Sequence, residues 1–238
     1  MKQIQVKGAI ISNNDKWFYD WLEMDATAPK DIVLPDTGED VEVIINSGGG
    51  DVYAGSEIYT TLRSYSGQVH VKIVGIAASA ASVIAMAGHR VEISPTAQIM
   101  IHNVSSGAYG DHKTLAHEAE VLEGFNKSIA SAYTAKTGKG LEELLQLMGE
   151  ETWFTAEKAV EHGFADSVMF ADQMAPSFVA TKSSIIPSDV IEKMRIAMSP
   201  PAIDIEELAE KVADQLATKE LKNEEVEMHN QGFGRFLF

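Results

Sequence analysis

The sequence predicts an α/β protein whose residues 1–170 fold around a buried, mostly parallel sheet. Short runs rich in β-branched residues, such as 41–45 and 69–74, are typical of strands. Between these two runs, Ala54 and Ile58 open a set of apolar residues at helical spacing. A strand, a helix and a second strand in this order predict a βαβ unit, and the alternation continues along the chain.

The remaining elements follow from the same two patterns. A segment of small residues at 80–87 favours a helix, and the longest helical pattern covers about 113–136. Thr155 can cap another helix, which Gly163 can end. In chain order the sequence predicts a strand at 4–11, a strand at 41–45, a helix at 54–65, a strand at 69–74, a helix at 80–87, strands at 90–93 and 98–101, and helices at about 113–136, 141–148 and 156–162.

The character of the chain changes near residue 171. Four of the seven prolines, at positions 176, 187, 200 and 201, follow this point. We therefore expect residues 171–202 to be a proline-containing linker. Residues 203–221 place apolar side chains on one helical face and acidic ones on the other, so 203–238 is expected to be an acidic amphipathic helix and tail. The second part of the chain is thus predicted to be a mostly helical C-terminal extension.

Composition excludes several classes of protein. The 238 residues are 45% hydrophobic and 23% charged, which suits a globular protein with a full core. No apolar run reaches the ~20 residues that cross a bilayer, so we expect a cytoplasmic protein without a membrane partner. The net charge of −16 disfavours nucleic-acid binding. The absence of cysteine excludes a thiolate nucleophile or a thiolate metal site.

Ser79 is the first residue that points to chemistry. It follows Gly75 by four positions, where a predicted strand turns into the helix at 80–87. A serine at such a turn can present its hydroxyl to a substrate, beside the free N–H groups of the helix. A serine at this position can also simply cap the helix, so Ser79 alone does not predict catalysis.

Two further segments stand at strand ends. The glycine run 48–50 follows a buried strand, and glycines let the backbone adopt positive φ and approach a ligand closely. The run lacks the lysine and hydroxyl of a phosphate-binding P-loop. His102 ends the strand at 98–101, and histidine is the usual base for a serine hydroxyl. A tight turn and a structural histidine are the alternatives.

Taken together and in order, four segments resemble the proteolytic subunit of Clp protease, ClpP. They are Ile45–Gly50, Gly75–Ser79, Met100–His102, and Trp153–Ala156 continuing through Gly163–Asp166. The resemblance covers roughly residues 1–170. It implies the spiral of βαβ units that ClpP shares with crotonases, a serine endopeptidase activity on protein and peptide substrates, and no cofactor or metal. It also implies a homo-oligomeric ring, a heptamer or a double ring, with the helix at about 113–136 between rings.

The resemblance also implies a role for individual residues. Ser79 matches the nucleophile of the family and His102 its base, while the amides of Gly50 and Ala80 match the oxyanion hole. Glu151 stands where the family usually has the aspartate that orients the histidine. Its carboxylate is one methylene longer, so the alternatives for the third residue are Asp111 and Asp166.

Several functions remain open at the level of sequence. The acidic tail and the short segment before the first strand are more similar to ClpP-related head maturation proteases of tailed phages, which process scaffold and capsid proteins, than to housekeeping ClpP. The alternatives are a degradative protease with an ATPase partner, a crotonase-type acyl-CoA enzyme, and a noncatalytic assembly protein that has lost its triad at Glu151.

Overall fold

The computed structural model describes residues 1–171, which form an eight-stranded sheet with helices packed against it. The expected features of residues 172–238, the linker and the acidic helix, lie outside the described residues. The elements in chain order are β1 (Lys2–Ile10), α1 (Lys16–Trp21), β2 (Ala26–Thr27), a 3-10 turn (Pro29–Asp31), β3 (Val41–Gly50), α2 (Val52–Arg63), β4 (Val69–Ala78), α3 (Ala80–Ala85), β5 (Arg90–Ile93), β6 (Gln98–Ile101), α4 (His112–Thr137), α5 (Leu141–Gly149), β7 (Thr152–Thr155), α6 (Ala156–Glu161) and β8 (Ser167–Val168).

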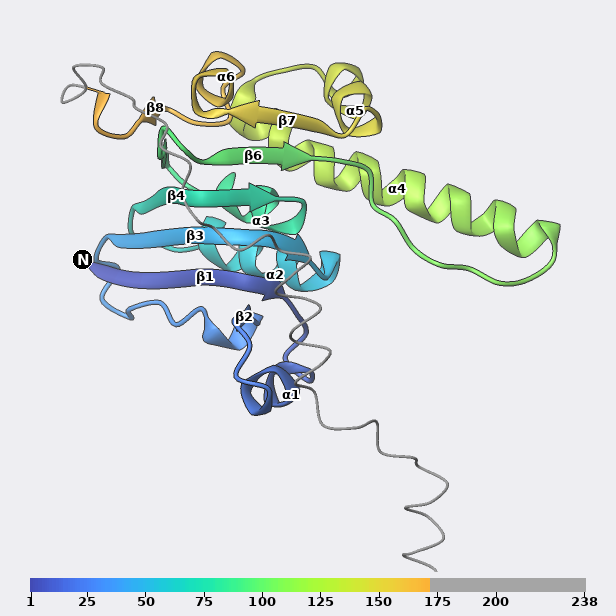
Figure 1. The fold of residues 1–238 in the computed structure, drawn as a ribbon, viewed down its shortest axis with the longest axis horizontal. Coiled ribbons are helices and arrows are strands. Elements are labelled where there is room, and N and C mark those ends of the chain that lie inside the picture. Colours follow the sequence, from blue (N-terminus) through green and yellow to red (C-terminus); the bar gives the residue numbers. More distant parts are fainter. Residues whose placement is uncertain (172–238) are drawn as a thin grey trace, which may run out of the picture. The chain divides into compact units, whose positions relative to one another are not determined.

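The main path of the sheet has the strand order β2-β1-β3-β4-β5-β8, and every pair along it is parallel. Strand β6 pairs with the last part of β4, and β7 pairs antiparallel with β6. The arrows of β1, β3, β4 and β6 lie side by side and end at one edge of the sheet (Figure 1). Residues at the carboxyl ends of these strands therefore meet along that edge. The predicted α/β class with a parallel sheet is confirmed.

The core follows from the β-branched runs that predicted the strands. Val43 and Ile45 on β3 and Val71 and Ile73 on β4 are completely buried. The helical spacing seen in the sequence gives α2 its buried face, and all six residues of α3 are buried. Since α3 is built from small side chains, it can pack closely against β3, β4 and α2. This close packing holds the start of α3 firmly at the end of β4.

Helix α4 is buried only in its C-terminal half, at Ile129, Ala130, Ala132 and Tyr133. Its first half continues beyond the edge of the sheet where β6 ends (Figure 1). The helix begins at Asp111, whose side chain accepts hydrogen bonds from the amides of two residues in the first turn, and it ends at Gly138 in the left-handed conformation. The predicted helix at about 113–136 is therefore present with both ends defined by caps.

Candidate active site

Ser79 is the single residue between the end of β4 and the start of α3. Its φ of 54° and ψ of −125° lie in a region that residues with a side chain rarely adopt. The Ser79 hydroxyl makes no hydrogen bond that caps α3, so Ser79 does not have the capping role that the sequence also allowed. The Ser79 N–H donates to the carbonyl of Met100 on β6, at 2.9 Å. A strained residue held in place by its neighbours is typical of a functional site.

His102 directly follows β6 and contacts the hydroxyl of Ser79. The distance from His102 Nε2 to Ser79 Oγ is 2.8 Å, and both residues are partly buried. The pairing of Ala78 with Met100 places the two strand ends next to each other. At this distance the hydroxyl can donate its proton to a neutral imidazole. The two side chains thus have the geometry of a serine nucleophile and its base.

The glycine run forms the end of β3 and lies against the turn that carries Ser79. Gly49 has a φ of 96°, and a Cβ atom there would stand 2.7 Å from both the carbonyl oxygen of Ala78 and the Cβ of Ser79. Gly50 has a φ of 149°, and a Cβ atom there would collide with the backbone of Ile10. Only glycine fits at these two positions, because a side chain at Gly49 would collide with the Ser79 turn and one at Gly50 would collide with Ile10 of β1.

Ser79 and His102 lie on the wall of a cavity of about 580 Å³. Gly50 and Ala80, the two predicted oxyanion-hole residues, line the same cavity. Much of its apolar lining comes from α4, which also contributes Glu118. The apolar side chains of this lining are Val121, Leu122, Phe125, Ile129 and Tyr133. A ligand in this cavity can therefore bury apolar groups beside the Ser79 hydroxyl.

Glu151 is the predicted residue that the structure does not bring to the others. Its backbone lies close to that of His102, because β6 and β7 pair antiparallel with Ile101 opposite Thr152. His102 directly follows Ile101, and Glu151 directly precedes Thr152. The side chain is exposed, and its Oε1 accepts a hydrogen bond from Trp153 Nε1 at 3.3 Å. Within residues 1–171 no carboxylate is hydrogen bonded to His102. The third residue stays a prediction.

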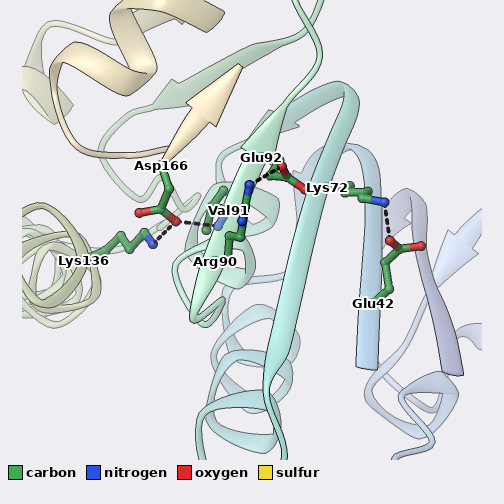
Figure 2. Close-up of polar contacts among 7 residues, drawn as sticks. All are labelled: Glu42, Lys72, Arg90, Val91, Glu92, Lys136 and Asp166. Atoms are coloured by element: carbon green, nitrogen blue, oxygen red, sulfur yellow. Dashed lines mark hydrogen bonds and ion pairs between the residues drawn. The ribbon is translucent and has the colours of Figure 1, made fainter. Parts of the chain in front are cut away.

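The two alternative acids have other partners. Asp111 accepts hydrogen bonds from the Thr114 amide, the Thr114 hydroxyl and the Lys113 amide at the start of α4, and these bonds, led by that of the Thr114 amide, lower the pKa of its carboxyl group. Asp166 Oδ2 accepts from the Val91 amide at 2.6 Å and from Lys136 Nζ at 2.7 Å (Figure 2). Both carboxylates support secondary structure instead of contacting His102.

Two residues at the site were not predicted to have a polar role. The Ser82 hydroxyl donates to the carbonyl of Ser79 at 2.6 Å, and it also lies 2.7 Å from the hydroxyl of Tyr133. In the sequence, Ser82 lies in the small-residue segment at 80–87 and Tyr133 in the helical pattern at about 113–136. Nothing local in the sequence signals a contact between residues so far apart in the chain.

Within residues 1–171, no group of three or more His, Asp or Glu side chains could hold a metal ion. Over the same part of the chain, no helix is both long and apolar enough to cross a membrane.

A serine hydroxyl in contact with an imidazole, at a strained strand-to-helix turn beside a cavity, defines the class of serine hydrolases. The family model of Clp protease matches residues 32–172, more than half of the chain. The chain therefore belongs to the Clp protease family, and its α/β fold is consistent with that family.

Relatives in bacteria carry the name of the proteolytic subunit. The chain is 33% identical over 136 residues to the ATP-dependent Clp protease proteolytic subunit of Bacteroides fragilis, covering 56% of this chain and 66% of the relative. It is 30% identical over 135 residues to subunit 2 of Tropheryma whipplei, covering 56% and 75%. It is 34% identical over 155 residues to subunit 3 of Rhodococcus jostii, covering 63% and 76%. The chain thus spans about two thirds of the Bacteroides relative it matches.

Proposed function

We propose that this protein is a serine endopeptidase that cleaves peptide bonds through an acyl-enzyme. The observation that carries the proposal is the 2.8 Å contact between Ser79 Oγ and His102 Nε2 at the wall of the cavity. Membership of the Clp protease family supports the same chemistry. Peptide hydrolysis by this route needs no cofactor.

The reaction follows from the proposed roles. As Ser79 Oγ attacks the peptide carbonyl, His102 Nε2 takes its proton, and the amides of Gly50 and Ala80 donate to the oxyanion. The C–N bond breaks as the imidazolium gives its proton to the leaving amine. Water, activated by the neutral His102, then releases the acid and regenerates Ser79.

Glu151 is proposed to orient His102 during this reaction. Its support is positional: the β6–β7 register sets its backbone beside that of His102. Glu151 also has a φ of 50°, and Ser79, at 54°, is another of the few non-glycine residues with positive φ in residues 1–171. Strained residues of this kind cluster at functional sites. The proposed role requires the carboxylate to leave Trp153 and accept a hydrogen bond from the imidazole.

The test is active-site labelling with a fluorophosphonate, followed by intact mass at neutral pH. We expect one adduct per chain in the wild type and none in Ser79→Ala. Ser106→Ala is the matched control, because Ser106 lines the same cavity but is not hydrogen bonded to His102. Labelling that persists in Ser79→Ala, or its absence from a folded wild type, would contradict the proposal.

For the biological role we propose head maturation in a tailed phage, with scaffold and capsid proteins as substrates in the host cytoplasm and a ring of seven subunits, or a double ring, as the assembly. The support is the acidic segment beyond the family match at residues 32–172. The names of the relatives favour an ATP-dependent degradative protease instead. Cleavage of an unfolded protein by the purified chain without nucleotide or ATPase would support head maturation. Cleavage of short peptides alone would support the ATP-dependent role.

One observation favours a second candidate, a noncatalytic assembly protein. Glu151 accepts a hydrogen bond from Trp153 and makes none with His102. A family member without an oriented histidine could retain the fold and lose the reaction. The labelling experiment separates the two candidates, since an assembly protein with an inactive serine takes up no probe.

A further inference from the structure

A buried chain of three polar groups lies directly beneath the Ser79 turn. The Ser82 hydroxyl donates to the Ser79 carbonyl oxygen at 2.6 Å, and the Tyr133 hydroxyl lies 2.7 Å from Ser82 Oγ. Ser82 is fully buried and Tyr133 is 1% exposed. Polar groups removed from water in this way are costly unless they are hydrogen bonded, so the two contacts strongly fix each other's geometry.

The direction of the chain follows from counting protons. A serine hydroxyl has one proton, and that of Ser82 is directed to the Ser79 carbonyl. The Tyr133 hydroxyl must therefore donate to Ser82 Oγ. Burial raises the pKa of Tyr133 far above its ordinary value, so the phenol stays protonated and remains a donor throughout the range in which a protease works. The chain thus runs from Tyr133 through Ser82 to the Ser79 carbonyl.

The Ser79 carbonyl belongs to the same planar peptide unit as the Ala80 N–H. Within a trans peptide unit the two groups point in opposite directions, so fixing the oxygen fixes the direction of the amide. The carbonyl is also held by the amides of Ser82, at 2.9 Å, and Val83, at 3.3 Å. Because Ser79 is strained, with a φ of 54°, this orientation depends on such contacts to persist.

We infer that Ser82 and Tyr133 are positioning residues, whose hydrogen bonds to the Ser79 carbonyl aim the Ala80 amide at the developing oxyanion. The inference rests on the proposed serine protease function and adds to it two residues that touch neither the scissile bond nor His102. Positioned donors are effective because they need no reorganisation when charge develops in the transition state.

Tyr133 also connects this device to the substrate cavity. Its ring lies edge-on to Phe164, with centroids 5.7 Å apart and an interplanar angle of 69°. Phe164 is fully buried, so its contact restricts rotation of the Tyr133 ring. Tyr133 lines the cavity together with Ile129 of the same helix. Tyr133 therefore lies between the cavity and the buried hydrogen-bonded chain, with only 1% of its surface exposed.

The test measures kcat and KM for a peptide substrate, and the inhibition constant of the matching peptide aldehyde, in Tyr133→Phe, Ser82→Ala and the double variant. We expect kcat to fall about 10-fold in each single variant with KM unchanged, which is below the ~10²-fold effect of removing an oxyanion donor outright. The aldehyde forms a hemiacetal whose oxygen occupies the oxyanion position, so its affinity should fall in parallel with kcat. The double variant should be no slower than Ser82→Ala, because both changes interrupt one chain.

The matched control is Tyr65→Phe. The Tyr65 phenol donates to the Glu39 carbonyl at a distance of 2.6 Å, and Tyr65 does not line the cavity. This variant should retain wild-type kinetics. Wild-type kcat in a folded Tyr133→Phe protein, or a rise in KM with no change in kcat, overturns the inference even if Ser82→Ala does not fold. A wild type that takes up no fluorophosphonate and cleaves no peptide overturns the proposed function, and the inference with it.

Discussion

The close contact between Gly49 and the Ser79 turn gives a prediction that can be worked out in detail. In Gly49→Ala the new Cβ would stand 2.7 Å from the Ala78 carbonyl oxygen, 2.7 Å from Ser79 Cβ and 3.1 Å from the Ala80 nitrogen. Ordinary contacts begin near 3.4 Å. The glycine strand and the serine turn must therefore separate by about 0.7 Å, the difference between 3.4 and 2.7.

The expected magnitudes follow from this separation. A left-handed φ of 96° adds about 1 kcal/mol of backbone strain for alanine, and the forced displacement adds about 1–3 kcal/mol. For a domain of this size, a loss of about 2–4 kcal/mol lowers the melting temperature by about 10 °C. A displacement of this order at the reacting groups reduces a reaction rate about 10²-fold, and we expect that loss in the rate of fluorophosphonate labelling.

Gly48→Ala is the matched control in the same loop. Nothing lies within 4 Å of a Cβ atom at Gly48, and its φ is not positive. We expect wild-type labelling and a melting temperature unchanged or slightly raised, because alanine restricts the unfolded chain. Wild-type labelling in Gly49→Ala would refute the reasoning. Equal loss of labelling in Gly48→Ala would show that the loop as a whole is sensitive, and not this contact.

Three further predictions concern carboxylates. Glu151→Gly should change the free energy of unfolding by less than about 1 kcal/mol, because glycine relieves the strain of a φ of 50° but has more freedom in the unfolded chain. Labelling should slow at least 10-fold, because the carboxylate is proposed to orient His102, and wild-type labelling would contradict that role. Asp111→Asn should label at the wild-type rate, because its carboxylate caps α4; slower labelling would identify it as the third acid. The pKa of Glu42 is lowered, first of all by the hydrogen bond from Lys72 (Figure 2). The ionised Glu42 therefore stabilises the fold above the ordinary glutamate pKa of about 4.3, and this contribution is lost as the pH falls through the lower pKa of the folded protein. The melting temperature of Glu42→Gln should therefore fall less steeply than that of the wild type below about pH 4.3, and parallel curves would contradict this assignment.

The sequence was sufficient where the signal is local. The strands at 90–93 and 98–101 are observed as predicted, because β-branched and apolar residues bounded by turn residues specify such strands. Ser79 and His102 could be paired because each stands at the end of a strand, and neighbouring parallel strands end at the same edge. Strand β3, by contrast, continues through the glycine run to Gly50, since pairing with β1 overrides the low strand propensity of glycine.

Other features could not be predicted, for physical reasons. Helix α1 is only six residues long, too short for a helical period to be recognised, and its apolar residues Trp17, Phe18 and Trp21 are exposed. The four-residue strand β7 exists because β6 provides an antiparallel edge, which is a tertiary contact. The hydrogen bond from Tyr133 to Ser82 depends on how α4 packs over α3. The direction of the Glu151 side chain depends on a rotamer, which no pattern of residues fixes.

Strand β4 changes its pairing partner along its length, from β5 to β6. Residues 70–73 pair with β5, whereas 76–78 pair with β6, and the change falls at Gly75, where a Cβ atom would collide with Asn46. The first half borders the charged groups of Arg90 and Glu92, and the second half ends at Ser79. Strand pairing on the β5 side is therefore separate from the pairing that holds the Ser79 turn. A change of surface charge at Arg90 or Glu92 can leave the position of Ser79 unaltered.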